Sequence, residues 1–227
     1  MGDFVSRTRR KSTRLDSIRA QNLSTSPRMS WTLFDVRGRR KYLVAAERKA
    51  FIEAAIAVGG ETSTFCMVLA FSGARISEVL AVTPERVDMM NGSINFETLK
   101  RRRRGVFRAV PVPKKLLDIL DDTHRIRDAQ SDSTRADKPL WRWSRTTAWR
   151  RVKHVMSIAG QPEHISQPKA LRHAFGAQAA KNKVSLTLIK KWMGHAKIET
   201  TEIYTELVGD EERSLARLTW ENTCDGF

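Results

Sequence analysis

Five widely separated side chains have the types that an attack on a phosphodiester requires: Arg75, Lys100, Arg172, His195 and Tyr204. A tyrosine hydroxyl can hold a phosphate covalently, so the energy of the broken bond is kept. Arginine suits the oxygens on which charge grows, because its guanidinium is planar, forked and always protonated. A further group must protonate the departing 5′-oxygen. The set predicts exchange of phosphodiester bonds without a metal or a nucleotide cofactor.

These side chains stand in short motifs, and each motif alone has an ordinary structural explanation. Arg75 begins a helix after Gly73 and could pair with Glu78 as a surface salt bridge. His195 could cap the C-terminus of a helix. Tyr204, nine residues after His195, could be a half-buried helix residue. These separate explanations do not account jointly for the order and spacing of the motifs.

In order and spacing, the motifs resemble the tyrosine recombinase (integrase) family. Its pattern is Gly-x-Arg-x-Ser-Glu, a lysine in a β-hairpin, His-x-Leu-Arg-His, Leu-Gly-His and Thr-Thr-x-x-Tyr. The corresponding stretches here are Gly73–Glu78, Lys100, Lys169–His173, Met193–His195 and Thr200–Tyr204. The resemblance covers residues 45–206. It implies site-specific cleavage and religation of DNA through a 3′-phosphotyrosine, with no cofactor.

The resemblance also implies a role for each matching residue. Tyr204 would attack the phosphate, Arg75 and Arg172 would hold its oxygens, Lys100 would protonate the 5′-oxygen and His195 would hydrogen-bond the phosphate. Glu78 lies one helical turn from Arg75 and is expected to orient its guanidinium. We expect His173 to support its neighbours rather than to touch the phosphate.

One position departs from the family pattern. The first histidine of His-x-Leu-Arg-His is Lys169 here. A protonated lysine donates hydrogen bonds but is not a ready base at neutral pH. We therefore expect Lys169 to hold the phosphate as a cation, and the group that serves as general base stays open.

Two basic segments are expected to bind DNA. The turn between the predicted strands carries Arg101, Arg102, Arg103 and Arg104, and the family uses this hairpin against DNA. A localisation signal or a merely solvated run is the alternative. The second segment alternates tryptophan and arginine, and we expect phosphate contacts from Arg145, Arg150 and Arg151. Its tryptophans are expected in the core.

Composition agrees with a polyanionic partner. The 227 residues include 41 Lys and Arg against 25 Asp and Glu, a formal net charge of +16. Such a surface attracts nucleic acid, although a ribosomal or generic basic protein would share it. Cys66 and Cys224 do not form a disulfide framework, and the histidines lack metal-ligand spacing, so we expect no metal. The sequence has no membrane-spanning stretch, and a cytoplasmic, nucleoid-associated protein is expected.

The spacing of apolar residues predicts a mostly α fold with one small antiparallel β-hairpin, the fold of the family's catalytic domain. Residues 94–98 and 106–112 alternate as strands, whereas 121–139 are polar and loop-like. A last helix, capped by Thr200 or Thr201, is expected to contain Tyr204. Other helices are expected to end at Gly59 and Gly73 and to cover 64–71, 76–82, 113–120, 144–160, 168–181 and 185–193.

The chain divides into three predicted parts. Residues 1–40 form a basic arm, 41–206 the catalytic domain and 207–227 a C-terminal tail. Because only a short segment precedes the predicted catalytic domain, the chain resembles the single-domain fimbrial phase-variation invertases. The family works as a homo-oligomer, a tetramer on two duplex DNA sites, and Leu207–Trp220 could dock on a neighbouring copy. An accessory DNA-bending protein could assist.

Two rival functions remain at this stage. A type IB topoisomerase shares the chemistry but acts as a monomer without a specific site. A non-catalytic DNA-binding relative would fit the loss of histidine at Lys169, although Arg75, Arg172 and Tyr204 are present. Integration, inversion and resolution are equally compatible with the sequence.

Overall fold

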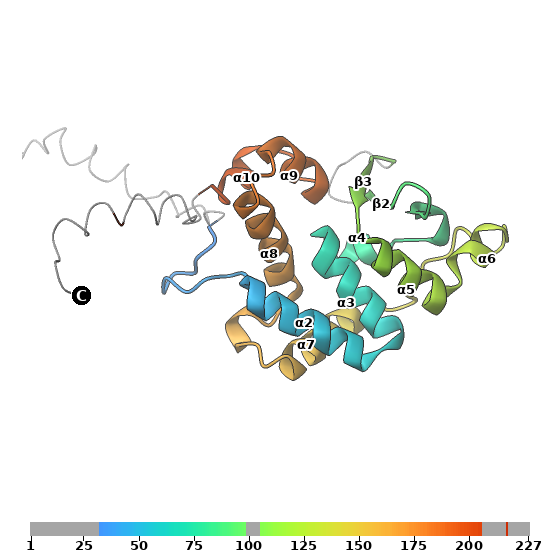
Figure 1. The fold of residues 1–227 in the computed structure, drawn as a ribbon, viewed down its shortest axis with the longest axis horizontal. Helices are drawn as coiled ribbons and strands as arrows, with labels where there is room; N and C mark the ends of the chain where they lie inside the picture. The colour runs from blue at the N-terminus through green and yellow to red at the C-terminus, as the bar shows by residue number, and fades with distance from the viewer. Residues whose placement is uncertain (1–31, 99–104, 206–216, 218–227) are drawn as a thin grey trace, which may run out of the picture. The chain divides into compact units, whose positions relative to one another are not determined.

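A computed structural model describes residues 32–98, 105–205 and 217. The fold is mostly helical with a three-stranded antiparallel sheet, which confirms the predicted fold class (Figure 1). The elements are α2 (Ala45–Val58), α3 (Gly60–Ser72), α4 (Ile76–Leu80), a 3₁₀ turn (Pro84–Arg86), β1 (Val87–Asp88), β2 (Ser93–Glu97), β3 (Phe107–Pro111), α5 (Lys114–His124), α6 (Ile126–Gln130), α7 (Arg145–Ile158), a second 3₁₀ turn (Glu163–Ile165), α8 (Pro168–Lys181), α9 (Leu186–Met193) and α10 (Glu199–Glu202).

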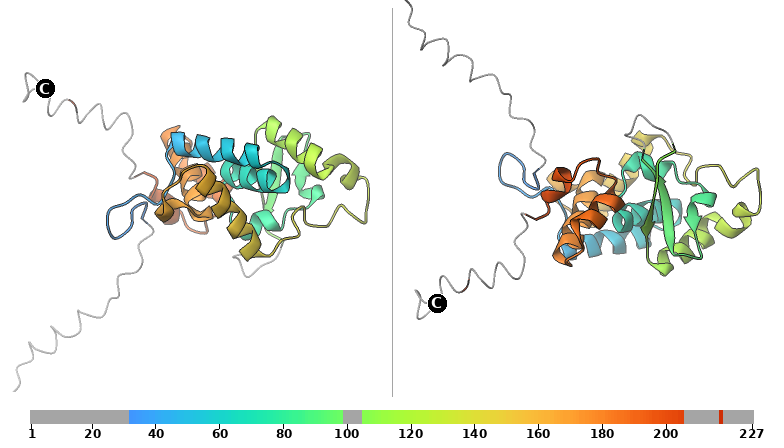
Figure 2. Two further views of the ribbon diagram at one scale, coloured as in Figure 1. Left: turned by 90° about the horizontal axis from the view of Figure 1, so that it is seen from below. Right: turned by 90° about the horizontal axis from the view of Figure 1, so that it is seen from above.

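Helix α3 is the central element of the core. It packs against α2, α5 and α8, and it lies between α5 and α8 in Figure 1. The views from below and above show α2 running beside it (Figure 2). Every residue from Thr62 to Ala70 is buried, as expected for a helix that is apolar all round. Helix α3 ends at Gly73, so its last turn delivers the chain directly to Arg75.

The sheet has the order β1-β2-β3, with Ile94 of β2 opposite Val110 of β3. The predicted hairpin is therefore confirmed, while the two-residue β1 was too short to give an alternating pattern. Residues 99–104 between β2 and β3 lie outside the described residues. Lys100 and the four arginines Arg101–Arg104 fall in that segment.

Two predicted elements differ from the structure. Residues 121–139 were expected to be a loop, but α5 continues to His124 and Ile126–Gln130 form α6, which buries Ile126 and Ala129. Tyr204 was expected within the last helix. Instead α10 ends at Glu202, and Tyr204 lies in the turn that follows. Both Ile203 and Tyr204 are buried in that turn.

A second, smaller core forms around Tyr204. It contains Leu33, Ala177, Ala179, Ile189, Met193, Ile203 and Tyr204. Leu33 belongs to the predicted basic arm, yet its side chain is fully buried. Although this segment was expected to be a basic arm, it therefore contributes Leu33 to the core.

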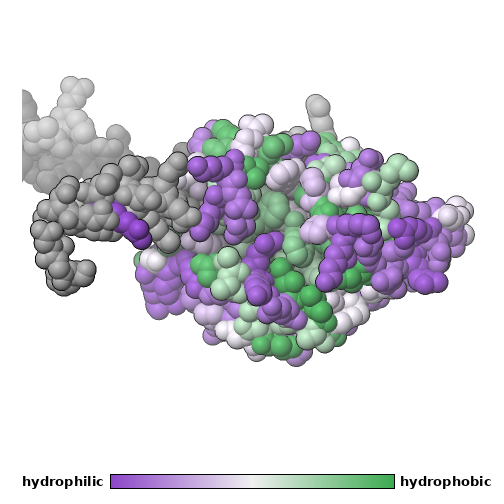
Figure 3. All heavy atoms as spheres, viewed as in Figure 1, coloured by the Kyte–Doolittle hydropathy of each residue, from purple (hydrophilic) through white to green (hydrophobic). Residues whose placement is uncertain are grey.

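The surface seen in Figure 3 is hydrophilic over much of its area, with apolar patches between. Among the described residues, no helix is long and apolar enough to cross a membrane.

Replacing Leu33 by alanine should lower the free energy of unfolding by about 2–5 kcal/mol, because it removes a fully buried side chain and leaves a cavity beside Tyr204. Chemical denaturation measures the change. Val36→Ala, at a fully exposed position nearby, is the control and should change stability by less than about 0.5 kcal/mol. Equal effects of the two substitutions would show that Leu33 does not belong to the core.

Candidate active site

Arg75 is placed by the first turn of α4. Its backbone N–H donates to Oε2 of Glu78 at 2.9 Å, and its Nη1 donates to Oε1 of the same carboxylate at 2.7 Å. The contact that the spacing of Arg75 and Glu78 predicts is therefore present. Glu78 itself is almost completely buried, so the guanidinium is held from the protein side and has limited freedom to turn away.

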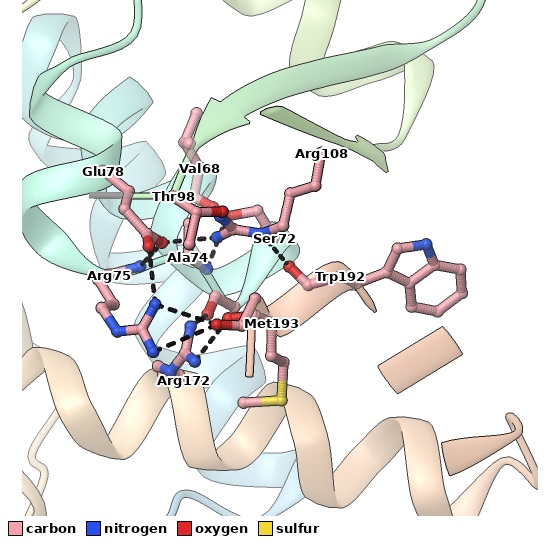
Figure 4. Close-up of polar contacts among 12 residues, drawn as sticks. Val68, Ser72, Ala74, Arg75, Glu78, Thr98, Arg108, Arg172, Trp192 and Met193 are labelled. Carbon is pink, nitrogen blue, oxygen red and sulfur yellow. Dashed lines mark hydrogen bonds and ion pairs between the residues drawn. The ribbon is translucent and has the colours of Figure 1, made fainter. Parts of the chain in front are cut away.

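Arg108 is a buried partner of Glu78 that the sequence analysis did not identify. Its Nη2 donates to Glu78 Oε2 at 2.6 Å, its Nη1 to Thr98 Oγ1 at 3.2 Å and its Nε to the carbonyl of Trp192 at 2.8 Å (Figure 4). It therefore ties the sheet to α4 and to the end of α9. Alternation along β3 could have revealed it, because Arg108 shares the inward face with Val110.

The environment of Glu78 favours its charged form. Burial pushes the pKa of Glu78 upward, but Arg108, Arg75 and the backbone N–H of Arg75 outweigh that effect and hold it below the ordinary value. A buried carboxylate is tolerated here because both of its oxygens accept hydrogen bonds from arginine N–H groups. The ionised Glu78 fixes two guanidinium groups at once.

Arg172 joins this cluster from α8. Its Nη1 donates to the carbonyl of Gly73 and its Nη2 to the carbonyl of Met193, each at 2.6 Å. Nη1 and Nη2 of Arg75 lie 3.5 Å from the next carbonyl, that of Gly194. Burial, and then the nearby Arg75, lower the pKa of Arg172 to about 9, so it stays protonated at neutral pH. Two arginines separated by about a hundred residues thus meet at the end of α9 (Figure 4).

Gly194 allows the close approach of Arg108. It ends α9 with φ of 63°, and a Cβ there would stand 2.9 Å from the guanidinium carbon of Arg108. His195 follows directly and is buried, with Nδ1 2.9 Å from Thr201 Oγ1. Burial, followed by Arg172 and Arg75, lowers the pKa of His195 to about 3, which keeps it neutral at physiological pH.

Tyr204 packs on α8 at Gly176, one turn after Arg172. Its ring lies flat against Gly176, where a Cβ would stand 2.3 Å from the ring carbon Cζ. Its hydroxyl is 3.2 Å from Nδ1 of His173. The side chain is only 1% exposed, and this burial raises the pKa of the phenol. The structure therefore describes Tyr204 in a sheltered position beside the arginine cluster.

Of the remaining predicted residues, Lys169 is described and the hairpin cations are not. Lys169 lies one turn before His173 on α8, and loss of solvent together with Lys41 lowers the pKa of its ammonium group. Lys100 and Arg101–Arg104 lie outside the described residues. The role of each predicted site residue stays a prediction.

The three arginines on α7 do not share one environment. All three are exposed, but Arg151 is held by neighbouring side chains. Arg151 stacks over the ring of Trp143, with 4.2 Å between its guanidinium carbon and the ring centroid, and donates to Thr62 Oγ1 at 2.7 Å. We therefore expect Arg145 and Arg150 to reach a phosphate more readily than Arg151.

The arrangement can bind an oxyanion. Arg75, Arg108 and Arg172 carry three positive charges against the one negative charge of Glu78, which leaves a surplus of two. Fixed guanidinium groups with a neutral histidine and a tyrosine nearby are suited to a phosphodiester. Among the described residues, no three His, Cys, Asp or Glu side chains gather into a metal-binding group.

Comparison with known families and proteins gives a consistent result. The family model described as "Phage integrase family" matches residues 41–210. The tyrosine recombinase XerD of Vibrio vulnificus (strain YJ016) is 25% identical over 151 residues, which cover 63% of this chain and 48% of that protein. The chain spans about half the length of the curated relatives it matches.

Solved structures agree with the fold. The crystal structure of XerA recombinase matches with a TM-score of 0.62 and 26% identity, covering 78% of this chain and 62% of that one. The XerH site-specific recombinase, bound to a palindromic difH substrate in a post-cleavage complex, matches with a TM-score of 0.67 over 80% of this chain and 53% of that one. Its identity is 19%, so this second likeness concerns the fold alone.

Replacing Glu78 by glutamine should lower the free energy of unfolding at pH 7 by about 3 kcal/mol, because Arg108 would keep a buried charge without its counterion. The folded pKa of Glu78 lies below the unfolded value of about 4.3. Its stabilising contribution is therefore complete above that pH and is lost as the pH falls through the folded pKa.

Denaturation of the wild type and Glu78→Gln between pH 3 and 8 measures this difference. The two curves should converge in the acid range. Glu53→Gln is the control, because Glu53 forms only an exposed pair with Lys49 and should matter little at any pH. A constant gap between wild type and Glu78→Gln down to pH 3 would contradict the assignment of an ionised Glu78.

Proposed function

The chain belongs to the phage integrase family, and we propose that it is a tyrosine recombinase that cleaves and rejoins DNA at specific sites through a 3′-phosphotyrosyl intermediate. One observation carries the proposal. The guanidinium groups of Arg75 and Arg172 meet at the end of α9, immediately before His195, while Tyr204 packs against the helix that bears Arg172. The XerD and XerA relatives are recombinases by name, which supports the same activity.

The proposed reaction is a transesterification in which bonds and protons balance. The Tyr204 oxygen forms a bond to phosphorus, and the bond from phosphorus to the 5′-oxygen breaks. The phenolic proton passes to a base, and Lys100 gives a proton to the 5′-oxygen. Rejoining reverses these steps with a 5′-hydroxyl of another strand, so no external energy source is required.

The arginines would stabilise the transition state through groups that the protein has already oriented. A guanidinium has five N–H donors, and Arg172 uses bonds to the Gly73 and Met193 carbonyls to fix its plane. A fixed fork does not need to reorganise when charge develops on the phosphate oxygens. Neutral His195, held by Thr201, would add a hydrogen bond.

Duplex DNA is the proposed partner, and the net charge of +16 supports it. The proposed assembly is a homo-oligomer, a tetramer on two sites, in which residues 207–227 dock on a neighbouring copy. The proposed division is an arm before residue 41, a catalytic domain over 41–206 and that tail. The arrangement of the two DNA sites, rather than the chemistry at each phosphate, would decide between integration, inversion and resolution.

Tyr204→Phe should abolish the covalent adduct with DNA and leave the affinity for DNA unchanged, because it removes only the attacking oxygen. A nicked suicide substrate that traps the cleaved state, followed by denaturing electrophoresis, measures the adduct. The sequence has one other tyrosine, Tyr42, and Tyr42→Phe should form the adduct normally.

An adduct that persists in Tyr204→Phe would contradict the proposal. Relaxation of supercoiled DNA without any specific site would favour a type IB topoisomerase instead.

Removing the exposed arginines of α7 should weaken DNA binding in a salt-dependent way. Each phosphate contact contributes about 0.9 to the slope of log affinity against log salt concentration. We expect Arg145→Ala combined with Arg150→Ala to flatten that slope by about one to two units, as measured by fluorescence anisotropy from 50 to 300 mM salt. Lys114→Ala, at an exposed position that pairs with Asp118, is the matched control. An unchanged slope would show that this face of α7 does not touch DNA.

A further inference from the structure

The hydroxyl of Tyr204 and the ring of His173 form a defined contact. The hydroxyl oxygen lies 3.2 Å from Nδ1 of His173. The tyrosine ring is held against Gly176, three residues after His173 on the same face of α8. Glycine inside a helix costs about 1 kcal/mol relative to alanine. Its presence where a Cβ would collide with the tyrosine ring indicates that this helix is built to receive Tyr204.

The protonation state of His173 suits a proton acceptor. Burial, then Lys169, Arg172 and Lys41, lower its pKa to about 3, so the imidazole is neutral at physiological pH. A neutral imidazole has one nitrogen with a lone pair. When Tyr204 donates to Nδ1, the proton of the ring resides on Nε2. Nε2 is buried, and no described protein group lies within hydrogen-bond distance of it.

The cations around His173 provide a link to substrate binding. Lys41, Lys169 and Arg172 all oppose a positive charge on the imidazole, and His195 and Tyr204 are its other titratable neighbours. A phosphate bound at Arg172 would bring a negative charge that offsets these cations. His173 would then become a stronger base only when DNA is present.

We propose that His173 is the general base of this chain, accepting the phenolic proton on Nδ1 as Tyr204 attacks the phosphate. The proposal rests on the proposed function above and names a residue that takes part in its first step. The Tyr204 oxygen bonds to phosphorus, its proton moves to Nδ1, and the 5′-oxygen departs with the proton from Lys100. During rejoining, the imidazolium returns the proton to the tyrosine oxygen.

Lys169, on the same helix, does not compete for this role while it is protonated, because an ammonium group has no lone pair. Lys169→Ala should therefore affect cleavage less than loss of His173. Comparing the two variants therefore separates a residue that accepts a proton, His173, from a cation that holds the phosphate, Lys169.

The experiment compares single-turnover cleavage of the suicide substrate by full-length variants. His173→Ala and His173→Asn should cleave about 10²–10⁴-fold more slowly than wild type, with unchanged DNA affinity and melting temperature. The asparagine variant retains a polar side chain that is not a base, so it covers the case in which the alanine variant fails to fold. His124→Ala is the matched control, because His124 is a partly buried histidine next to a hydroxyl, 2.8 Å from Thr64 Oγ1, and it should cleave like the wild type.

A second measurement separates a base from a structural support. In a Tyr42→Phe background, fluorinated tyrosine supplied during expression enters at position 204 alone. Its phenol is a stronger acid and depends less on a base. Fluorotyrosine should therefore restore cleavage by His173→Ala at least tenfold at neutral pH, and the pH at which that variant reaches its half-maximal rate should fall.

Three outcomes would overturn the inference. Cleavage by His173→Ala as fast as wild type, or faster, would show that the contact only holds Tyr204 at rest. A slow variant that fluorotyrosine does not restore would show a positioning role. Failure of the wild type to form any adduct would overturn the proposed function as well, so the two failures are distinguishable.

Discussion

The site depends on one buried carboxylate. Glu78 receives hydrogen bonds from Arg75 on one side and Arg108 on the other, and those two arginines belong to different parts of the fold. Arg108 in turn reaches the carbonyl of Trp192, near the end of α9. A buried charge is tolerated only with such partners. Because Glu78 is the shared counterion of both arginines, its loss would leave Arg108 a buried charge without a carboxylate. The shared contacts hold the start of α4, strand β3 and the end of α9 in one arrangement.

Much of this arrangement is local and could be read from the sequence. Gly73 and Gly194 predict the C-termini of helices, and the three-residue spacing from Arg75 to Glu78 predicts the start of one. The structure has a helix end at each of these places. The spacing of apolar residues is also a local signal, and it predicts the fold class and most of the helices. The resemblance of five ordered motifs then identified residues that the fold does bring into one cluster, most clearly Arg75 and Arg172.

Other features depend on tertiary contacts and left only weak local signals. Arg108 lies in a basic stretch, and only its inward position on β3 distinguishes it from a surface arginine. Leu33 stands in an arginine-rich segment, but it is buried against Ile203 and Tyr204, far away in sequence. Likewise, α10 ends at Glu202, and the turn after it places Ile203 and Tyr204 in the same small core as Leu33. Such choices depend on which surface is available in the folded chain.

Helix α8 brings these constraints together, because it presents neighbouring residues to different partners. Consecutive residues point about 100° apart around a helix, so Arg172 faces the carbonyls of Gly73 and Met193 while His173 faces Tyr204. An anion bound at Arg172 would therefore lie close to His173, the next residue, whose imidazole contacts Tyr204, the proposed nucleophile. Helix α8 thus positions both Arg172 and His173, the hydrogen-bond partner of Tyr204. A negative charge bound at Arg172 would therefore act on the imidazole of His173. Burial disfavours the charged forms of both His173 and Tyr204, so transfer of the phenolic proton to the imidazole has an electrostatic cost that an anion bound at Arg172 would reduce.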